Sequence, residues 1–257
     1  MTAGTEGTSG TSGTSRRAEL ATAVSAVRSR IETACVAAGR DPGEVTLVVV
    51  TKYFPVSDVL LLHDLGARHF GENRDQEAGE KFAEVRAALG DGVDLTVHFI
   101  GQLQTNKAGH VASYADVVQS LDRARLVGAL DRGARHADRR LDVLLQIDLG
   151  TRPRDQTGGD GAGRGGLRPE DADELAEAVA ATDLLRLRGV MAVAPRDADP
   201  DEAFARLREV GDGIRRRHPD ASWISAGMSG DLEAAVRHGA THLRVGTAIL
   251  GSRPSLL

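Results

Sequence analysis

Eight short apolar runs, separated by segments with helical patterns, constrain the fold of this chain more than any other feature. Most of them are continuously apolar, which is typical of parallel strands covered on both faces of a sheet. Eight such strands with intervening helices fit a single α/β domain, a closed (β/α)8 barrel of the TIM type with about 250 residues. An open doubly wound sheet is the competing arrangement. The predicted strands span residues 45–52, 67–71, 95–101, 117–121, 141–148, 187–193, 223–226 and 241–246.

The segments at the start of the chain and after the fifth run fall outside this rhythm. Residues 1–15 are rich in Gly, Ser and Thr and predict a disordered tail, which leaves one barrel domain over residues 16–257. Four apolar residues just after the tail recur at helical spacing and predict an extra N-terminal helix. They are Leu20, Val24, Val27 and Ile31. The Gly-rich segment Asp155–Gly166 predicts a mobile loop, for which a lid and plain disorder are both open readings.

Charge and cysteine content exclude several classes of partner. A net charge of −5 argues against nucleic acid or an anionic membrane surface, because binding to phosphates needs excess positive charge. No apolar run approaches the roughly 20 residues that span a bilayer. Cys35 is the single cysteine, which suits a reducing compartment, and no His/Cys cluster has the spacing of a metal site. We expect a cytoplasmic protein without a metal, and a barrel with no added dimerisation domain is expected to be a monomer.

The use of lysine singles out one residue. Only three of the 32 basic residues are lysines, and Lys52 ends the first predicted strand. Arginine stays protonated in proteins, whereas a desolvated lysine can be neutral and nucleophilic near pH 7. Lys52 is therefore a candidate for a Schiff base. The alternative is a strand-end lysine whose stem covers apolar surface while its ammonium group reaches water.

The last two predicted strands lead into an anion site. Phosphates commonly bind after strands seven and eight of such barrels, where glycines, hydroxyls and a positive charge supply donors. Those residues here are Ser225, Gly227, Ser229, Arg244, Gly246 and Thr247, although ordinary turn chemistry would also use several of them. Strand eight neighbours strand one in a closed barrel, so Lys52 should lie beside the anion. A ligand with an aldehyde and a phosphate fits, such as pyridoxal 5′-phosphate or the sugar phosphate of a Schiff-base aldolase.

Two polar residues near other strand ends have less certain roles. Asn73 follows the second strand and His98 lies in the third. Either could line the ligand pocket. Asn73 could equally cap the helix that begins near Arg74, and a lone histidine in a strand is more often a satisfied core residue.

Long stretches of the chain resemble the pyridoxal phosphate homeostasis proteins, which share the fold of the N-terminal domain of alanine racemase. The matching stretches are VTLVVVTKYFPVSDV, GARHFGENRDQE, HFIGQLQTNK, QSLDR, LLQIDLG, LRGVMAVAP and ISAGMSGDLEAAVRHGATHLRVGTAILGSR. They cover nearly everything between Arg16 and Arg253. One departure is that Arg164 stands where the family usually has a lysine of a Lys-x-Gly element.

The resemblance implies pyridoxal 5′-phosphate as cofactor, with Lys52 as the carrier of the internal aldimine. It implies that Ser229, Gly246 and Thr247, together with Ser225, hold the phosphate. It further implies that Arg244 faces the pyridine nitrogen, that Asn73 approaches the ring hydroxyl and that His98 lines the pocket.

Three functions compete on these residues. A carrier for vitamin B6 homeostasis would hold the cofactor without robust catalysis and exchange it with dependent apoenzymes. A racemase needs a base on each substrate face, and neither Tyr53, Tyr114 nor Cys35 is well placed to be the second one. A Schiff-base aldolase would not explain Arg244. Because a guanidinium cannot easily protonate the ring nitrogen, Arg244 should restrain carbanion chemistry, and we expect a carrier.

Overall fold

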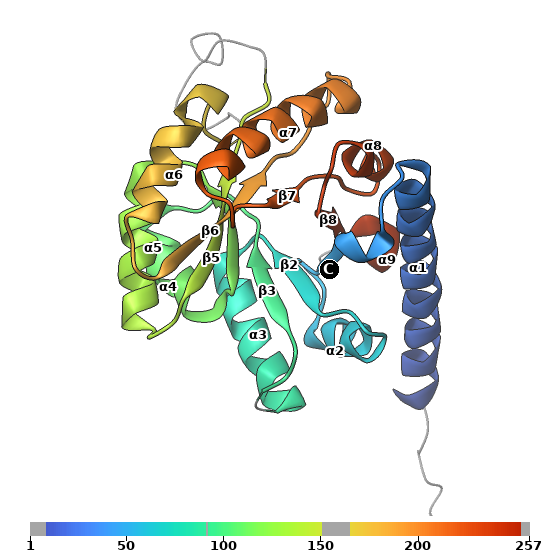
Figure 1. The fold of residues 1–257 in the computed structure, drawn as a ribbon. Helices are drawn as coiled ribbons and strands as arrows, with labels where there is room; N and C mark the ends of the chain where they lie inside the picture. The colour runs from blue at the N-terminus through green and yellow to red at the C-terminus, as the bar shows by residue number, and fades with distance from the viewer. Residues whose placement is uncertain (1–8, 91, 151–164, 253–257) are drawn as a thin grey trace, which may run out of the picture.

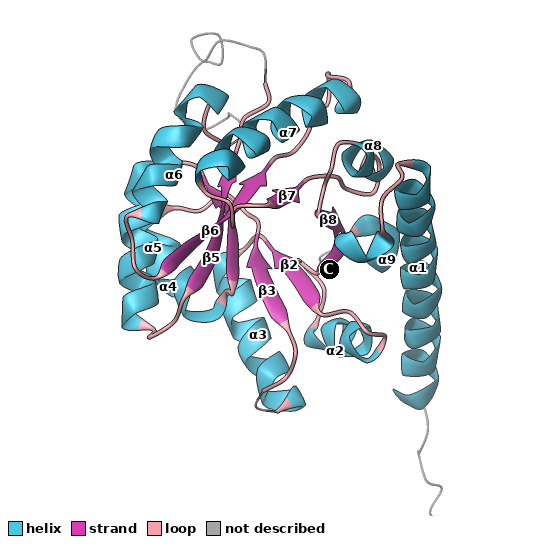
Figure 2. Ribbon diagram, in the orientation of Figure 1, coloured by secondary structure: helices cyan, strands magenta, loops and turns pink. Residues whose placement is uncertain are grey.

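The computed structural model describes residues 9–90, 92–150 and 165–252 of the 257-residue chain. Eight parallel strands pair in chain order and close into a barrel, with β8 beside β1, which confirms the predicted (β/α)8 fold. Figure 2 shows the strands at the centre and the helices around them. The strands are β1 (Thr46–Val50), β2 (His69–Glu72), β3 (Thr96–Phe99), β4 (Val117–Leu121), β5 (Leu141–Gln146), β6 (Leu185–Met191), β7 (Trp223–Ser225) and β8 (His242–Val245).

The α-helices follow the strands around the outside of the barrel (Figure 1). They are α1 (Ser9–Ala37), α2 (Val56–Asp64), α3 (Asp75–Leu89), α4 (Ala108–Tyr114), α5 (Ala124–His136), α6 (Ala172–Ala180), α7 (Pro200–Arg217), α8 (Leu232–Arg237) and α9 (Thr247–Leu250). Short 3₁₀ helices lie at Pro42–Glu44, Thr105–Lys107 and Pro169–Asp171. The helices α4 and α9 are too short for hydrophobic periodicity to define their bounds.

The N-terminal helix completes the ring of helices. Within the described residues only the short α9 follows β8, and α1 packs against α8, α9 and α2 in the place left open (Figure 1). The four residues at helical spacing are buried against the barrel, as predicted. The helix begins at Ser9, inside the segment expected to be a tail, while residues 1–8 lie outside the described residues.

Three arginines of α1 and the turn after it fasten the helix to the last part of the chain. Arg16 donates to Asp58 and to the carbonyl of Leu250 in α9. Arg30 binds Glu233 of α8 and the carbonyl of Ser229, and Arg40 binds carbonyls at the end of α8. The helix therefore holds the loops that follow β7 and β8.

The core has an aliphatic outer layer and a polar interior. Leu, Val, Ala and Phe side chains fill the space between strands and helices. Inside the barrel, Val117, Leu144 and Met191 form a small separate apolar cluster with Trp223 against it. The rest of the interior carries polar side chains from five strands, which is unusual because barrel interiors are mostly branched aliphatic residues. They are His69, His98, Gln119, Ser225, His242 and Arg244.

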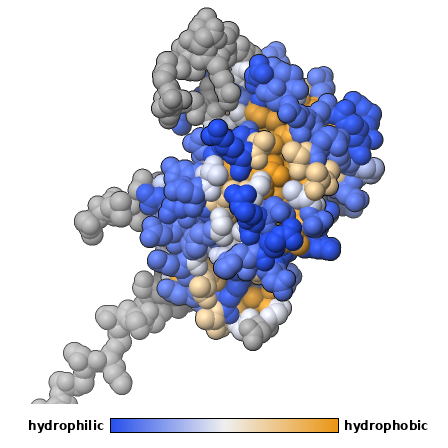
Figure 3. Space-filling view, turned by 90° about the vertical axis from the view of Figure 1, so that its left-hand side faces the viewer, coloured by the Kyte–Doolittle hydropathy of each residue, from blue (hydrophilic) through white to orange (hydrophobic). Residues whose placement is uncertain are grey.

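The outside of the barrel is mainly hydrophilic on the face seen in Figure 3, with apolar residues visible between charged ones. No helix within the described part of the chain is long and apolar enough to cross a membrane. Most of the Gly-rich segment predicted as a loop lies outside the described residues. Its last residues are described, and Gly165 accepts a hydrogen bond from Gln146 Nε2 at 2.6 Å.

Candidate functional site

Lys52 lies where β1 ends and the chain turns. Thr51 points outward, since its hydroxyl donates to Glu72 Oε1 at 2.8 Å behind the strands. Lys52 follows as the second residue of this turn and is half-buried. Its amine lies 6.0 Å from the ring centre of Tyr53 and makes no hydrogen bond or ion pair with a described residue.

Barrel closure brings the end of β8 to the same place. Val49 of β1 pairs with Val245 of β8, so Val50 lies beside Gly246. The contact is close, because a Cβ atom on Gly246 would lie 3.2 Å from the carbonyl oxygen of Val50. A hydroxyl donor is supplied here by Thr247, the exposed first residue of α9. The structure thus brings the Lys52 turn and the segment from Gly246 to Thr247 together.

The loop after β7 supplies Ser229, which is half-buried and held through its backbone carbonyl by Arg30 at 3.2 Å. Gly227 has a different role from the one expected. Its φ of 89° favours glycine, and a Cβ atom there would lie 2.6 Å from the side chain of Ala235. Gly227 is therefore required for packing against α8.

Arg244 is a buried cation without an anionic partner among the described residues. The residue is only 4% exposed, and its guanidinium donates to Ser225 Oγ at 2.6 Å and to the carbonyl of Ala192 at 2.8 Å. None of the described carboxylates forms an ion pair with it. Burial lowers the pKa of Arg244 to about 10, so it remains charged at neutral pH. A buried charge in this state favours an acceptor from a ligand.

Neutral side chains connect Arg244 across the barrel to β2. Ser225 Oγ donates to Gln119 Oε1 at 2.7 Å, Gln119 Nε2 contacts His98 Nδ1 at 2.9 Å, and His98 Nε2 contacts His69 Nδ1 at 3.0 Å. Because arginine can only donate, the chain has one direction, which assigns the ring proton of His98 to Nε2. We call the four residues from Ser225 to His69 the interior chain.

The histidines of this region are kept neutral. Burial lowers the pKa of His98 well below its ordinary value, and the nearby His242, His69 and Arg244 lower it further. The pKa of His242 falls to about 3, mainly through burial. The interior therefore adds no further positive charge beside Arg244 at neutral pH.

Two residues expected to contact the ligand are bonded to the protein instead. His98 is fully buried with both ring nitrogens bonded to protein, so it is the satisfied core residue that the sequence left open. Ser225 is fully buried as well, and its hydroxyl bonds Arg244 and Gln119. Ser225 bonds Arg244 directly, and His98 is connected to it through Gln119 and Ser225.

Asn73 lies at the end of β2 with its amide oxygen Oδ1 buried and without a hydrogen-bond partner among the described residues. It does not cap α3, because the N-cap residue is Arg74 and no side chain bonds the first turn. The backbone is fixed by close packing, since a Cβ atom on Gly101 would lie 2.3 Å from the carbonyl oxygen of Asn73. The orphaned amide fits a ligand contact.

Sequence reasoning missed the interior residues Gln119 and His69. Each is a polar residue next to an apolar one in a short strand, Gln119 after Val118 and His69 before Phe70, and that signal was available. It also missed the buried Lys81, which lies on α3 four residues after Glu77. Among the described residues no group of three or more His, Cys, Asp or Glu side chains is arranged to hold a metal ion.

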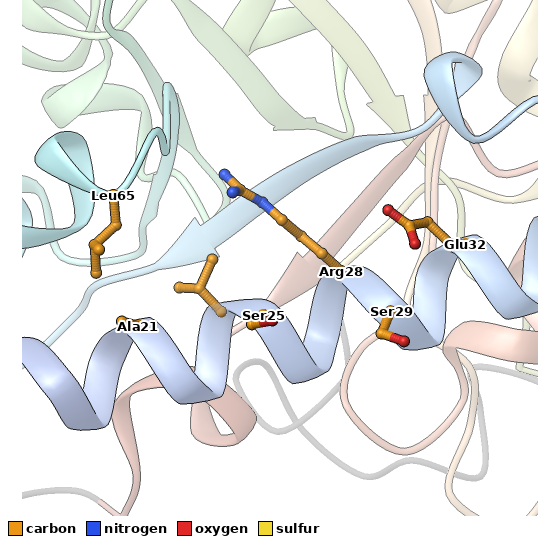
Figure 4. Close-up of a pocket in the computed structure, with 7 residues that line it drawn as sticks. Ala21, Ser25, Arg28, Ser29, Glu32 and Leu65 are labelled. Atoms are coloured by element: carbon orange, nitrogen blue, oxygen red, sulfur yellow. The ribbon is translucent and has the colours of Figure 1, made fainter.

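A cavity of about 480 Å³ lies elsewhere, on the outside of the barrel between α1 and the end of α2 (Figure 4). Arg28 closes one side of it by donating to the carbonyl of Gly66 at 3.1 Å. The rest of its lining comes from α1 and Leu65. The cavity is separate from the strand ends that carry Lys52 and Arg244.

Comparison with known proteins places the chain in a family. The family described as alanine racemase, N-terminal domain, matches residues 24–254. A pyridoxal phosphate homeostasis protein of Mycobacterium bovis is 44% identical over 249 residues, which cover 91% of this chain and 93% of the relative. This chain belongs to the pyridoxal phosphate homeostasis protein family.

Other members of the family extend the likeness to distant bacteria and to a solved structure. The Escherichia coli K12 member is 35% identical over 238 residues, covering 91% of this chain and 97% of its own. The structure of PipY from Synechococcus elongatus with PLP bound has a TM-score of 0.74 and 31% identity, and covers 90% of this chain and all of its own.

Proposed function

We propose that this protein binds pyridoxal 5′-phosphate covalently through Lys52 and maintains the cell's supply of this cofactor without turning over a substrate. The observation that carries the proposal is Arg244, a buried cation with no carboxylate partner in the described chain, on the strand beside that of Lys52. The orphaned amide of Asn73 is a second group that fits the cofactor. The bound PLP of the PipY relative supports the same cofactor here.

Each residue would contact a different part of the cofactor. Ser229, Gly246 and Thr247 supply donors for the phosphate, and Asn73 faces the ring hydroxyl. Arg244 donates to the pyridine nitrogen, held in place by Ser225. The cofactor would supply an aldehyde, and the amine of Lys52 would hold it covalently as a Schiff base.

The proposal of a carrier is supported by what surrounds Lys52. Racemisation needs a second base opposite the lysine. Tyr114 packs in the outer layer against Gly79 of α3, and burial and nearby carboxylates raise its pKa. Cys35 is buried in α1, and Tyr53 follows Lys52 directly in the turn. Arg244, a donor, leaves the ring nitrogen unprotonated and limits its capacity to accept electrons.

The proposal also covers the protein's setting. The protein would act in the cytoplasm as a monomer and exchange the cofactor with dependent apoenzymes. The net charge of −5 supports the absence of a nucleic-acid partner. Sedimentation velocity would distinguish a monomer from a dimer.

Borohydride reduction tests the covalent assignment. We expect one pyridoxyl group per chain, located on Lys52 by peptide mapping and absent from Lys52→Ala. Lys107→Ala serves as the control, because that lysine is half exposed and 3.9 Å from Asp75. An adduct on Lys81 or Lys107 in the wild-type protein would contradict the assignment. Rapid loss of optical activity from any amino acid in a panel would contradict the carrier role.

A further inference from the structure

The turn that carries Lys52 has a strained backbone. Phe54 N–H donates to the carbonyl of Thr51 at 3.1 Å, which makes residues 51–54 a β-turn. Its third residue, Tyr53, has φ of 70°, a value that a type II turn normally gives to glycine. A non-glycine residue keeps such a conformation only where its surroundings enforce it.

A buried cluster on α3 and β2 enforces this conformation. Lys81 Nζ donates to the carbonyl of Thr51 at 2.9 Å and to Glu72 Oε1 at 2.8 Å. Glu77 Oε1 accepts from the Tyr53 N–H at 2.7 Å and from Lys81 at 3.2 Å. Hydrogen bonds from the cluster therefore reach the turn on both sides of Lys52.

The cluster is built as a rigid unit. The side chains of Lys81 and Glu72 are 6% and 0% exposed, and Glu72 also accepts from the Thr51 hydroxyl. Burial alone would raise the pKa of Glu77, but the Tyr53 N–H and Lys81 outweigh it and lower the pKa, so Glu77 stays ionised. Charged hydrogen bonds in a region with little water are strong and directional.

We propose that Lys81, Glu72 and Glu77 are positioning residues that hold the strained turn so that Lys52 presents its amine to the aldehyde of the cofactor. This inference rests on the proposed function. The residues touch no ligand themselves, since they lie behind the strands. Their hydrogen bonds reach the turn that carries the amine, whereas the phosphate-binding segments come from β7, β8 and α9.

The test separates covalent capture from binding. Pyridoxine 5′-phosphate carries a hydroxymethyl group in place of the aldehyde, so it can occupy the phosphate and ring contacts without bonding to Lys52. The variant combines Lys81→Met with Glu72→Gln, which removes the ammonium group without leaving an unpaired buried charge. Stopped-flow absorbance gives the rate of covalent capture of pyridoxal 5′-phosphate, and fluorescence titration gives the affinity for the analogue.

We expect covalent capture about tenfold slower or more, because small misplacements of a reacting group cost rate steeply. Affinity for pyridoxine 5′-phosphate should stay within about twofold of wild type. The control is Arg86→Met at the other end of α3, where Arg86 binds Asp116 and the carbonyl of Tyr114. That variant loses an ion pair of the same helix and should keep the wild-type rate of capture.

Capture at the wild-type rate in the double variant would overturn the inference and leave the proposed function standing. Equal losses for both ligands, or a slow Arg86→Met variant, would overturn it too, because the role would then be general stability. Wild-type protein that binds neither ligand would contradict the proposed function itself. If the double variant does not fold, Glu77→Leu removes the acceptor of Tyr53 N–H and leaves Lys81 paired with Glu72, with the same slowing expected.

Discussion

Two buried cations of this barrel have opposite surroundings. Lys81 lies behind the strands with two carboxylates within 3.2 Å, and every contact of its ammonium group belongs to the protein. Arg244 lies inside the barrel, and its hydrogen-bond partners in the described part of the chain are a hydroxyl and a carbonyl. A neutralised charge can fix a backbone, whereas a charge left without a counter-ion can still bind a ligand. The difference separates the structural cation from the one available for recognition.

The largest expected effect compares the two cations in the protein without ligand. Lys81→Met should lower the free energy of unfolding by about 3–5 kcal/mol, because it leaves buried carboxylates without a cation. Arg244→Met should change it by no more than about 1 kcal/mol, because the removed charge was itself desolvated. Urea unfolding measures both. Similar losses for the two variants would remove the distinction.

The second prediction concerns ligand affinity, for which Arg244 is expected to be the more important cation. Arg244→Met should weaken the affinity for pyridoxal 5′-phosphate about 10- to 100-fold, the worth of one hydrogen bond from a charged group. Absorbance titration measures it. Arg188→Met is the control, since Arg188 lies over the Trp223 ring at 4.5 Å and its ion pair is with Asp142 at 3.9 Å. Unchanged affinity in Arg244→Met would exclude Arg244 from the site.

The third and smallest effect concerns pH and the neutral surroundings of Arg244. The pKa of His242 is lowered to about 3, so between pH 6.5 and 3 the unfolded chain binds a proton that the folded protein does not. Stability should therefore fall through this residue as the pH decreases, with a slope that approaches about 1.4 kcal/mol per pH unit below about pH 6. Urea unfolding of His242→Phe at pH 7, 6 and 5 should show a slope reduced by this amount. Equal slopes would mean that the pKa of His242 is not lowered in the folded protein.

The sequence predicted the barrel because each strand shows its own apolar run, and all eight were found. Local patterns fail at short elements, so α4 and α9 had no predicted bounds. The first strand was predicted to reach Lys52 but ends at Val50, because the chain turns where Thr51 bonds Glu72. Apolar composition cannot reveal such a turn.

For the candidate site, the sequence alone singled out Lys52, Arg244, Asn73 and the hydroxyls after the last two strands, because each follows or ends a recognisable run. It also marked His98 and Ser225 as polar, but their partners lie on other strands. Only the closed barrel decided that Ser225 bonds Arg244 and that Gln119 links Ser225 to His98. The Lys81 cluster joins a turn, a strand and a helix in the same way. Alternation along a strand determines which way a side chain points. The partner that this side chain contacts depends on closure of the barrel, because closure brings distant segments within hydrogen-bonding distance.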